Sequence, residues 1–525
     1  TEAAASDASA SDEGKVLNIY CWNEEFKSRV TDHYPGYTEV DATTGTIGDV
    51  TVKWNITPND DNAYQNNLDA TLLKQADAAA DDKIDIFLVE ADYALKYVDT
   101  DYTMAVSDLG ITDSDLSKQY QYTKDVVTNS DGVLKGLSWQ GCPGVLFYNR
   151  DAAKAVLGSD DPAEVQNYVK DWDTFNDTAK KMKDAGYTIT SSANDTYRVY
   201  SNNVTSKWVV DGKINIDDNI MKWVDDSKEL VDAGETGTYE LWSDDWKKGF
   251  YPEGNVFCYF GPAWLVNFSM AADTEGSIGY NGGWGATEGP QGFFWGGTWI
   301  CAANGTDNQS LVKDIMLQMT TNDDVMREII EKDDDFVNNQ DVIVEMADSS
   351  YASKILGGQN PLGIYNEGVS KLDLSNLSSY DQGCNEEFQH AMKNYFEGSA
   401  TKEEAFAIGN ETSQKVHNAL KWIIRRQGGT YDTMVFATWE TAEDSAGELE
   451  VRWDSDTEHI ISEFDEWDTG LEAPEFDTNA IGAELFQKAM SGYRTLQNEE
   501  ECPTTMKYMV LLGVDAATPG RLAVV

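Results

Sequence analysis

Aromatic side chains beside polar residues are the strongest chemical signal in this sequence. Seven of them lie in predicted turns or at predicted strand ends, next to Gly, Asn, Gln, Asp or Pro: Trp22, Tyr93, Trp139, Trp264, Trp284, Trp295 and Trp299. An indole ring can cover an apolar ligand face, while carboxylates and amides take the ligand's hydroxyl groups. We expect several of these rings to line a cleft, although core packing explains any single tryptophan equally well.

Polar residues lie next to three of these aromatic residues. Asn23 and Glu24 follow Trp22, Glu90 and Asp92 precede Tyr93, and Gln140 follows Trp139. Two carboxylates could also serve a glycosidase, but with 92 acidic residues some pair is always available. Glu24, Glu90 and Asp92 are therefore predicted to contact a ligand, with no catalytic role.

The motifs of most enzyme classes are absent from the sequence. There is no phosphate loop, no dinucleotide fingerprint, no nucleophile elbow and no zinc-protease helix. The six cysteines are widely spaced and only four histidines exist, so we expect no metal and no cofactor. The cysteines resemble buried small hydrophobic residues, and a disulfide between two of them stays open.

The charge of the chain limits its partners. The 525 residues include 39 Lys and Arg against 92 Asp and Glu, a net charge of −53. Such a field repels nucleic acid and anionic membrane surfaces. Hydrophobic residues make up 41% and aromatic residues 11%, so the acidity does not indicate disorder. A halophilic origin is compatible with the same composition.

The elements that must position these residues form an alternating pattern. Residues 15–22, 50–56 and 84–89 are predicted strands, separated by predicted helices at 26–34 and 63–80. The order β-α-β-α-β predicts an open α/β sheet with helices on both faces. Ligands bind at the carboxyl ends of such strands, which here carry Trp22 to Glu24 and Glu90 to Tyr93.

A second α/β unit follows. A turn followed by a strand is predicted within 137–148 and a buried strand at 255–260, and the predicted helices are 172–186, 220–233 and 242–250. Further helices are expected at 311–319, 323–331 and 385–421, with a break near Gly398. Beyond residue 421 a densely acidic segment begins, which we expect to be a small α+β domain or an extension.

Several segments, taken in order, resemble the carbohydrate-specific solute-binding proteins of bacterial ABC importers, the relatives of maltose-binding protein. They are the small-residue start, the strand ending in Trp22 and Asn23, and the segments 85–97, 137–150, 172–175, 250–264 and 294–308. The resemblance covers about residues 15–421 and leaves the acidic tail unexplained.

The resemblance implies a two-lobe periplasmic-binding-protein fold, with two open α/β sheets joined by a hinge and a ligand cleft between them. The implied organisation is a tether at 1–14, lobe 1 at 15–130 with about 270–330 returning to it, and lobe 2 at 131–269. Helices in 331–421 would pack on lobe 2 and the hinge, and 422–525 would be an acidic extension of unknown role.

The resemblance also implies the function and the partners. A neutral mono- or oligosaccharide, with an oligosaccharide favoured by the many aromatic platforms, would be bound by lobe closure and passed to ABC permease subunits. Trp22, Asn23, Glu90, Asp92, Trp284, Trp295 and Trp299 would face the cleft near lobe 1 or the hinge, and Trp139, Gln140 and Trp264 would face it from lobe 2 or the crossover. A lipidated cysteine outside this sequence would hold the protein at the extracellular face of the cytoplasmic membrane, and a periplasmic location is the alternative. An extracellular glycosidase and a receptor for a non-sugar solute stay open as alternatives.

Overall fold

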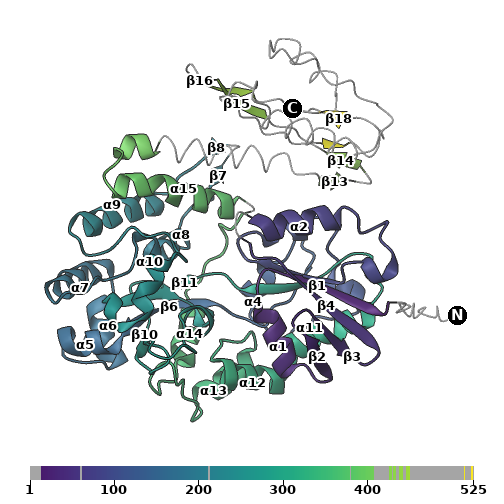
Figure 1. Ribbon diagram of the computed structural model, residues 1–525, viewed down its shortest axis with the longest axis horizontal. Coiled ribbons are helices and arrows are strands. Elements are labelled where there is room, and N and C mark those ends of the chain that lie inside the picture. Colours follow the sequence, from purple (N-terminus) through teal and green to yellow (C-terminus); the bar gives the residue numbers. More distant parts are fainter. Residues whose placement is uncertain are drawn as a thin grey trace. The chain divides into compact units, whose positions relative to one another are not determined.

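Two β-sheets organise the part of the chain that this computed structural model describes, which comprises residues 14–59, 62–210, 213–378 and 380–406 together with short strands beyond residue 424. The chain divides into two units, Thr1–Val210 with Asn215–Gly409, and Asp211–Ile214 with Asn410–Val525. The two sheets both belong to the first unit (Figure 1).

The first sheet has six strands and defines what we call lobe 1. In spatial order the strands are β12 (Thr298–Ala302), β5 (Ile86–Glu90), β1 (Val16–Cys21), β4 (Val50–Ile56), β3 (Thr44–Ile47) and β2 (Tyr37–Asp41). β1 is parallel to both β4 and β5, as the predicted β-α-β-α-β order requires, while β12 runs antiparallel to β5. The predicted α/β class is confirmed.

Helices cover both faces of this sheet because its central strands are apolar on both sides. Ile86 and Leu88 of β5 pack with Phe26 of α1 (Glu25–His33), whereas Phe87 packs on the other side with Leu68 of α2 (Ala63–Leu72). α2 is shorter than the helix predicted over 63–80, since a series of turns follows Leu72.

The second sheet has four strands and defines lobe 2. β6 (Pro143–Asn149) lies between β10 (Trp284–Thr287) and β11 (Phe293–Phe294), and it also pairs with β9 (Cys258–Gly261). The chain therefore stays with the second sheet through β11 and returns to lobe 1 only at β12. The sequence predicts this return earlier, at about residue 270. The reason is that the aromatic segment 284–294 pairs antiparallel with β6.

The remaining helices of the first unit are mostly short. They are α3 (Ala94–Val98), α4 (Gln121–Asp125), α5 (Arg150–Leu157), α6 (Pro162–Val169), α7 (Trp172–Asp184), α8 (Tyr197–Ser201), α9 (Asp218–Asp232), α10 (Asp244–Lys247), α11 (Gln309–Thr321), α12 (Asp323–Asp333), α13 (Gln340–Ala347), α14 (Leu362–Val369) and α15 (Asp381–Phe396). α14 packs on β6 and α15 packs on α9, so both belong with lobe 2. None of the described helices combines the length and the apolar character that a membrane crossing needs.

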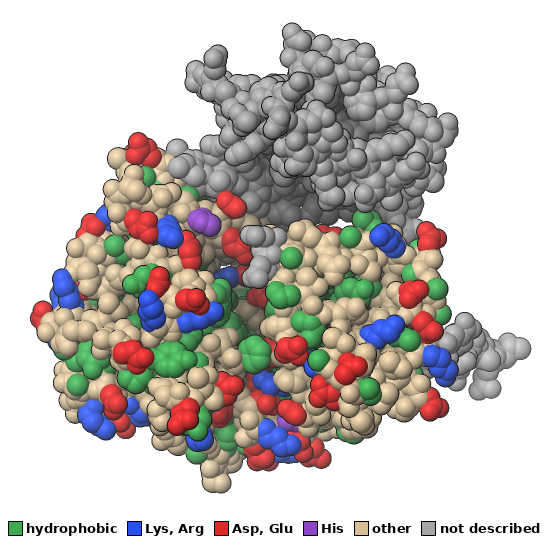
Figure 2. All heavy atoms as spheres, viewed as in Figure 1, with side chains coloured by type: hydrophobic (Ala, Val, Ile, Leu, Met, Phe, Trp, Pro, Cys, Tyr) green, Lys and Arg blue, Asp and Glu red, His purple; other side chains and the backbone are tan. Residues whose placement is uncertain are grey.

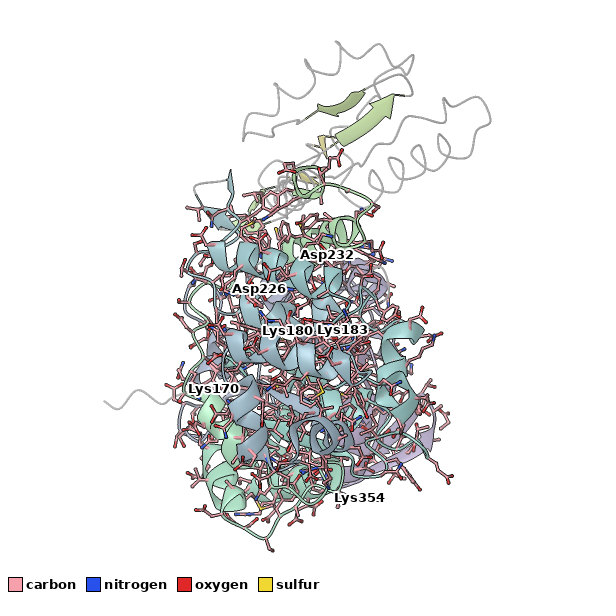
Figure 3. The ribbon with its side chains drawn as sticks, turned by 90° about the vertical axis from the view of Figure 1, so that its left-hand side faces the viewer. Lys170, Lys180, Lys183, Asp226, Asp232 and Lys354 are labelled. Atoms are coloured by element: carbon pink, nitrogen blue, oxygen red, sulfur yellow. The ribbon has the colours of Figure 1, made fainter. Side chains whose placement is uncertain are left out.

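Side-chain contacts tie the outer elements of lobe 2 together. Figure 3 shows Lys180 and Lys183 of α7 on the same outer face as Asp226 and Asp232 of α9, and Lys183 donates a hydrogen bond to the carbonyl of Ala233 at the end of α9.

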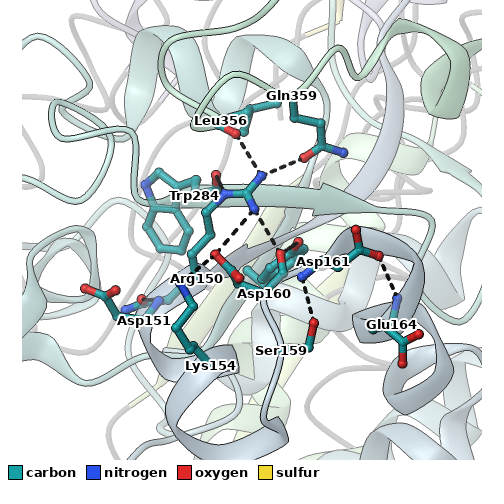
Figure 4. A network of polar contacts seen from close by, with 12 residues as sticks. Arg150, Asp151, Lys154, Ser159, Asp160, Asp161, Glu164, Trp284, Leu356 and Gln359 are labelled. Atoms are coloured by element: carbon teal, nitrogen blue, oxygen red, sulfur yellow. Dashed lines mark hydrogen bonds and ion pairs between the residues drawn. The ribbon is translucent and has the colours of Figure 1, made fainter.

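Arg150 joins three further segments of lobe 2. Its guanidinium donates to the carbonyls of Trp284 at 2.8 Å, Asp160 at 2.9 Å and Leu356 at 2.8 Å (Figure 4). The half-buried Arg150 guanidinium thus fixes the start of β10 against the end of α5 and the loop before α14.

Three chain segments cross between the lobes, at residues 137–142, 295–297 and 335–340. Leu137 bridges to Ile300 of β12, and Gln140 bridges to Val337, so the three crossings lie side by side. Gly296 and Gly297 both have positive φ, at 65° and 99°, a pair of conformations that side-chain-bearing residues rarely adopt.

The second unit is described only through short strands. They are β8 (Lys213–Ile214), β13 (Arg425–Gln427), β14 (Thr430–Asp432), β15 (Ala437–Thr441), β16 (Ser445–Leu449), β17 (Gly513–Val514) and β18 (Leu522–Ala523). β7 (Val209–Val210) precedes β8 in the first unit. The predicted tether and most of the α+β segment expected at 422–525 lie outside the described residues.

Candidate functional site

The ends of the parallel strands β1 and β5 bring aromatic and acidic residues together at one edge of lobe 1. Trp22 directly follows β1, and its ring lies 6.2 Å from that of Tyr93, which follows β5. Glu90 and Asp92 lie in the same turn, where a Glu90 carboxylate oxygen accepts a hydrogen bond from the Asp92 amide at 2.8 Å. This edge faces lobe 2.

Asn23 and Glu24 serve the start of α1 in this structure. The Asn23 side-chain oxygen accepts a hydrogen bond from the Glu25 amide at 3.0 Å. Glu24 is exposed, and its carboxylate lies 3.4 Å from Lys27 Nζ.

An ion pair joins the two lobes at this edge. Arg198, on α8 of lobe 2, donates from both terminal nitrogens to the two carboxylate oxygens of Asp92, with an Nη1–Oδ1 distance of 2.8 Å. The side chains of Arg198 and Asp92 are 16% and 15% exposed, so the pair is largely withdrawn from water. Bidentate pairs of this kind combine strength with a fixed geometry.

Further carboxyl groups surround this ion pair. Burial, followed by repulsion from Asp92, raises the pKa of Glu90 well above its ordinary value. Burial raises the pKa of Asp381, on α15, to about 7. Glu386, one turn further along α15, is within electrostatic reach of both Asp92 and Arg198.

A pocket with an empty volume of about 680 Å³, part of it open solvent, adjoins the ion pair. Figure 2 shows the face on which the lobes meet, with acidic side chains beside the hollow between them. The lining is polar with a few apolar residues: Ala91, Asp92, Arg198, Ser201, Asn202, Val204, Ser206, Trp208, Asn215, Asp217, Ile220, Phe294, Gly296, Asp373, Leu374, Asn376, Leu377, Asp381 and Asn385.

Three indole rings, which we call the indole cluster, lie next to this pocket. Trp264 is 5.1 Å from Trp295, and Trp242 is 6.3 Å and 5.9 Å from these two rings. The Arg198 guanidinium lies 5.7 Å from the Trp295 ring. Gly296 connects the two regions, because a Cβ there would meet Trp264 at 3.0 Å and Glu90 at 3.4 Å.

Trp242 is the outermost ring of the indole cluster. Its side chain is 43% exposed, and its φ of 71° is in the left-handed region that bulky residues avoid. Strained residues that the surrounding structure holds in place are concentrated at ligand sites. The arrangement offers apolar ring faces beside carboxylates and a guanidinium, which suits a polar molecule with an apolar face.

Four of the predicted site tryptophans are buried, Trp139, Trp284, Trp295 and Trp299, and the residues that line the pocket include none of the predicted site aromatics. Trp139 is 0% exposed and stacks on Phe26, Trp284 is 0% exposed within β10, and Trp299 is 1% exposed. The Trp299 indole nitrogen donates to the Thr123 carbonyl at 2.8 Å. These rings pack with core residues in this structure.

Gln140 lies where the three crossings meet. Its side-chain nitrogen donates to Glu25 of α1 at 2.7 Å and to Asp335 of the third crossing at 3.0 Å. Its side-chain oxygen accepts from the Thr298 amide at 3.1 Å. Gln140 is therefore a buried link in the hinge.

Sequence reasoning missed Arg198, Trp242 and the α15 carboxyl groups. Trp242 looks like the first residue of a helix, and α10 in fact begins at Asp244. Arg198 could have been singled out, because an arginine between two tyrosines in a strongly acidic chain needs a carboxylate partner. Among the described residues, no group of three or more His, Cys, Asp and Glu is arranged to hold a metal ion.

Comparisons with known structures agree with this architecture. A binding protein from B. animalis subsp. lactis Bl-04, solved with β-1,6-galactobiose, is 17% identical with a TM-score of 0.58, covering 78% of this chain and 98% of its own. The galacto-N-biose/lacto-N-biose I-binding protein of Bifidobacterium longum is 13% identical, with a TM-score of 0.57 and coverages of 78% and 99%. MalE of Xanthomonas citri is 14% identical, with a TM-score of 0.56 and coverages of 78% and 98%. These likenesses confirm the two-lobe binding-protein fold.

Comparisons of the sequence divide the chain in two. No curated protein matches it. A family model described as CRISPR-associated protein (Cas_Csd1) matches residues 389–525, about a quarter of the chain. A model described as bacterial extracellular solute-binding protein matches residues 40–353, more than half of it. This family binds solutes and is not enzymatic, as the missing catalytic motifs led us to expect, and the chain belongs to the bacterial extracellular solute-binding proteins.

Proposed function

We propose that this protein binds a neutral sugar between its two lobes and delivers it to the permease of an ABC importer outside the cytoplasmic membrane. The observation that carries the proposal is the indole cluster, with the exposed ring of Trp242, beside the Asp92–Arg198 ion pair and its pocket. Indole faces match the C–H face of a pyranose, and the carboxylates can accept its hydroxyl hydrogens.

An oligosaccharide is favoured over a monosaccharide because the site is extended. Two groups of rings offer stacking faces, Trp22 with Tyr93 and Trp242 with Trp264 and Trp295, and Gly296 lines the pocket beside the second group. Two of the similar structures were solved with disaccharides, β-1,6-galactobiose and lacto-N-biose. The proposed contacts are Trp22, Glu90, Asp92, Trp264 and Trp295, with Trp242 and Arg198 added.

Closure of the lobes is proposed to trap the ligand. A ligand that contacts Glu90 or Asp92 of lobe 1 and Trp264 of lobe 2 binds the closed state more tightly, and this difference in affinity drives closure. A lipid anchor, on a cysteine outside this sequence, is proposed to keep the protein near its permease.

A cationic solute is the second candidate. It is favoured by the surplus of carboxyl groups, since Glu90, Asp92, Asp381 and Glu386 surround a single guanidinium. An amino sugar or a polyamine would balance this charge, and its ammonium groups would bind well over indole faces.

Thermal unfolding with a panel of solutes tests both candidates. A ligand that binds only the native state raises Tm. We expect β-1,6-galactobiose, lacto-N-biose or another neutral oligosaccharide of the panel to raise Tm, with glucosamine and spermidine ineffective. The opposite pattern would establish the cationic solute. Mass spectrometry after long incubation should recover the sugar intact, and release of reducing ends would contradict the proposal.

A further inference from the structure

The boundary between the lobes holds more negative than positive groups. Glu90 and Asp92 stand on the lobe 1 side, and Asp381 and Glu386 stand on α15. Among the described residues, Arg198 is the only cation within ion-pair distance of any of these four carboxyl groups. The charge balance at this boundary therefore depends on one guanidinium.

The two pairs of carboxyl groups belong to different lobes. α15 packs on α9 and so moves with lobe 2, while Glu90 and Asp92 end a strand of lobe 1. The N-terminal part of α15 also reaches α2 of lobe 1, where Gln65 donates to Gln382 at 3.1 Å. The described contacts therefore join the two lobes at this boundary.

Arg198 is held in place from lobe 2. Arg198 projects from α8, and its guanidinium lies beside the Trp295 ring. The preceding residue, Tyr197, donates its hydroxyl hydrogen to the side-chain oxygen of Asn385 on α15 at 2.6 Å. Because the Arg198 side chain is already held in place, little further side-chain entropy is lost when it forms the bidentate pair with Asp92 of the other lobe.

We propose that Arg198 is the positioning residue that allows the two lobes to close, because its guanidinium neutralises carboxylates that closure brings together. Without it, Glu90 and Asp92 would meet Asp381 and Glu386 across a boundary with little water, where like charges repel strongly. Only the purpose of closure rests on the proposed function, since the ion pair itself involves no ligand.

The closed state of a variant without this cation should depend on pH. The titratable groups around Arg198 are Glu90 and Asp92 after β5, Tyr197 on α8, and Asp381 and Glu386 on α15, while the neighbouring segment 293–297 carries no charge. Burial raises the pKa of Asp381 and of Glu386 to about 7, so these two groups take up protons near neutral pH and their repulsion with Asp92 fades below it. Burial, followed by repulsion from Asp92, also raises the pKa of Glu90 well above its ordinary value.

Hydrogen–deuterium exchange of the full chain, with no ligand present, tests the proposal. In Arg198→Gln at pH 8 we expect amides of residues 90–94 and 197–201 to exchange about tenfold faster than in the wild type, because exchange follows the population of open states. At pH 5.5 the ratio of variant to wild type should fall toward one. Amides of Val50–Ile56, in the core of lobe 1, should be unaffected.

Two further variants sharpen the test. Arg327→Gln removes a guanidinium from an exposed pair with Glu345 and should leave both segments unchanged. Glu90→Gln/Asp92→Asn/Arg198→Gln removes the repulsion together with the cation and should restore slow exchange at pH 8. Equal exchange of Arg198→Gln and the wild type at both pH values would overturn the proposal, as would faster exchange throughout both lobes. If the thermal-unfolding panel identified no sugar, the proposed function would fail, but the exchange experiment on Arg198 would keep its meaning because it uses no ligand.

Discussion

Trp242 shows how a single residue can be placed at a cost to the backbone. Its left-handed φ is unfavourable for a large side chain, yet it turns an indole outward beside Trp264 and Trp295. The strain is maintained because Trp242 also packs on the fully buried Trp246, at a ring distance of 5.1 Å. The residue is thereby held in place before a ligand arrives, which reduces the entropy lost on binding.

Trp242→Ala should weaken binding of the preferred sugar of the panel at least about tenfold, the effect of losing roughly 1.4 kcal/mol of contact energy. The fold should persist, because the ring is 43% exposed. Isothermal titration calorimetry measures the change. Tyr280→Ala removes another exposed ring, which lies beside Lys354, and should bind like the wild type. Unchanged affinity in Trp242→Ala would exclude this ring from the site.

At the residue scale, the sequence predicts which residues at the strand ends lie together better than it predicts where a single tryptophan ring points. Parallel neighbours share an edge, and Trp22 does meet Tyr93 there. A tryptophan next to glycine or proline marks a turn, but the direction of its ring depends on distant partners. Trp299 turns inward because its nitrogen meets a carbonyl 176 residues away, and Arg198 finds Asp92 106 residues away.

Among the elements, the three crossings between the lobes depend on a buried polar network. Gln140 links Glu25, Asp335 and the Thr298 amide, and Arg29 of α1 lies 3.0 Å from Asp333 and 3.9 Å from Glu25. Burial raises the pKa of Glu25 to about 7, with nearby Asp335 adding to the effect and Arg29 opposing it. The buried environment of the hinge therefore favours the protonated, neutral form of the Glu25 carboxyl group.

The raised pKa of Glu25 makes the free energy of unfolding depend on pH. A carboxyl whose pKa rises on folding, here from about 4.3 to about 7, stabilises the fold fully at acid pH and loses that contribution as pH rises through 7. Glu25→Gln keeps an acceptor for Gln140 without the charge. We expect its free energy of unfolding at pH 8 to exceed that of the wild type by about 1 to 3 kcal/mol, and the two to converge toward pH 5.

Urea unfolding at several pH values measures this difference. Glu24→Gln, at the exposed neighbouring residue, should follow the wild-type curve, so that a general effect of net charge is separated from the hinge. A Glu25→Gln protein with the same pH slope as the wild type would show that Glu25 is charged in the native state at neutral pH.

The elements themselves were predictable where burial sets the pattern. β4 has the expected bounds, and β1, β5 and α7 lie within a few residues of them. The β2–β3 hairpin escapes prediction because β2 is exposed along most of its length and its turn is built by Asp41, whose carboxylate accepts from the amides of Thr43 and Thr44. Such local hydrogen bonds leave no hydrophobic period to detect.

At the scale of the whole molecule, the chain combines a complete binding-protein body with a further segment. The similar structures are covered over 98 to 100% of their own lengths by 77 to 78% of this chain. The first unit, which ends at Gly409, contains both sheets and the candidate site. The change in character near residue 421 is visible in the sequence because acidic residues become dense there.

We therefore expect residues 1–409 alone to fold and to bind the preferred sugar with an affinity within about twofold of the full chain, since the core of each lobe lies within this unit. Calorimetric titration and a thermal unfolding scan of both proteins measure this. Loss of binding, or of a cooperative transition, in the shorter protein would show that the tail supports the receptor.

The outward turn of Trp242 also gives the protein an intrinsic optical signal. An indole in contact with water emits at longer wavelength than one in an apolar environment, and this ring is 43% exposed while Trp295 is 9% exposed. Its neighbours at 5.9 Å and 6.3 Å are close enough to pass it their excitation. A sugar that covers Trp242 should therefore shift the emission of the whole cluster to the blue, and the unlabelled receptor would report its own occupancy.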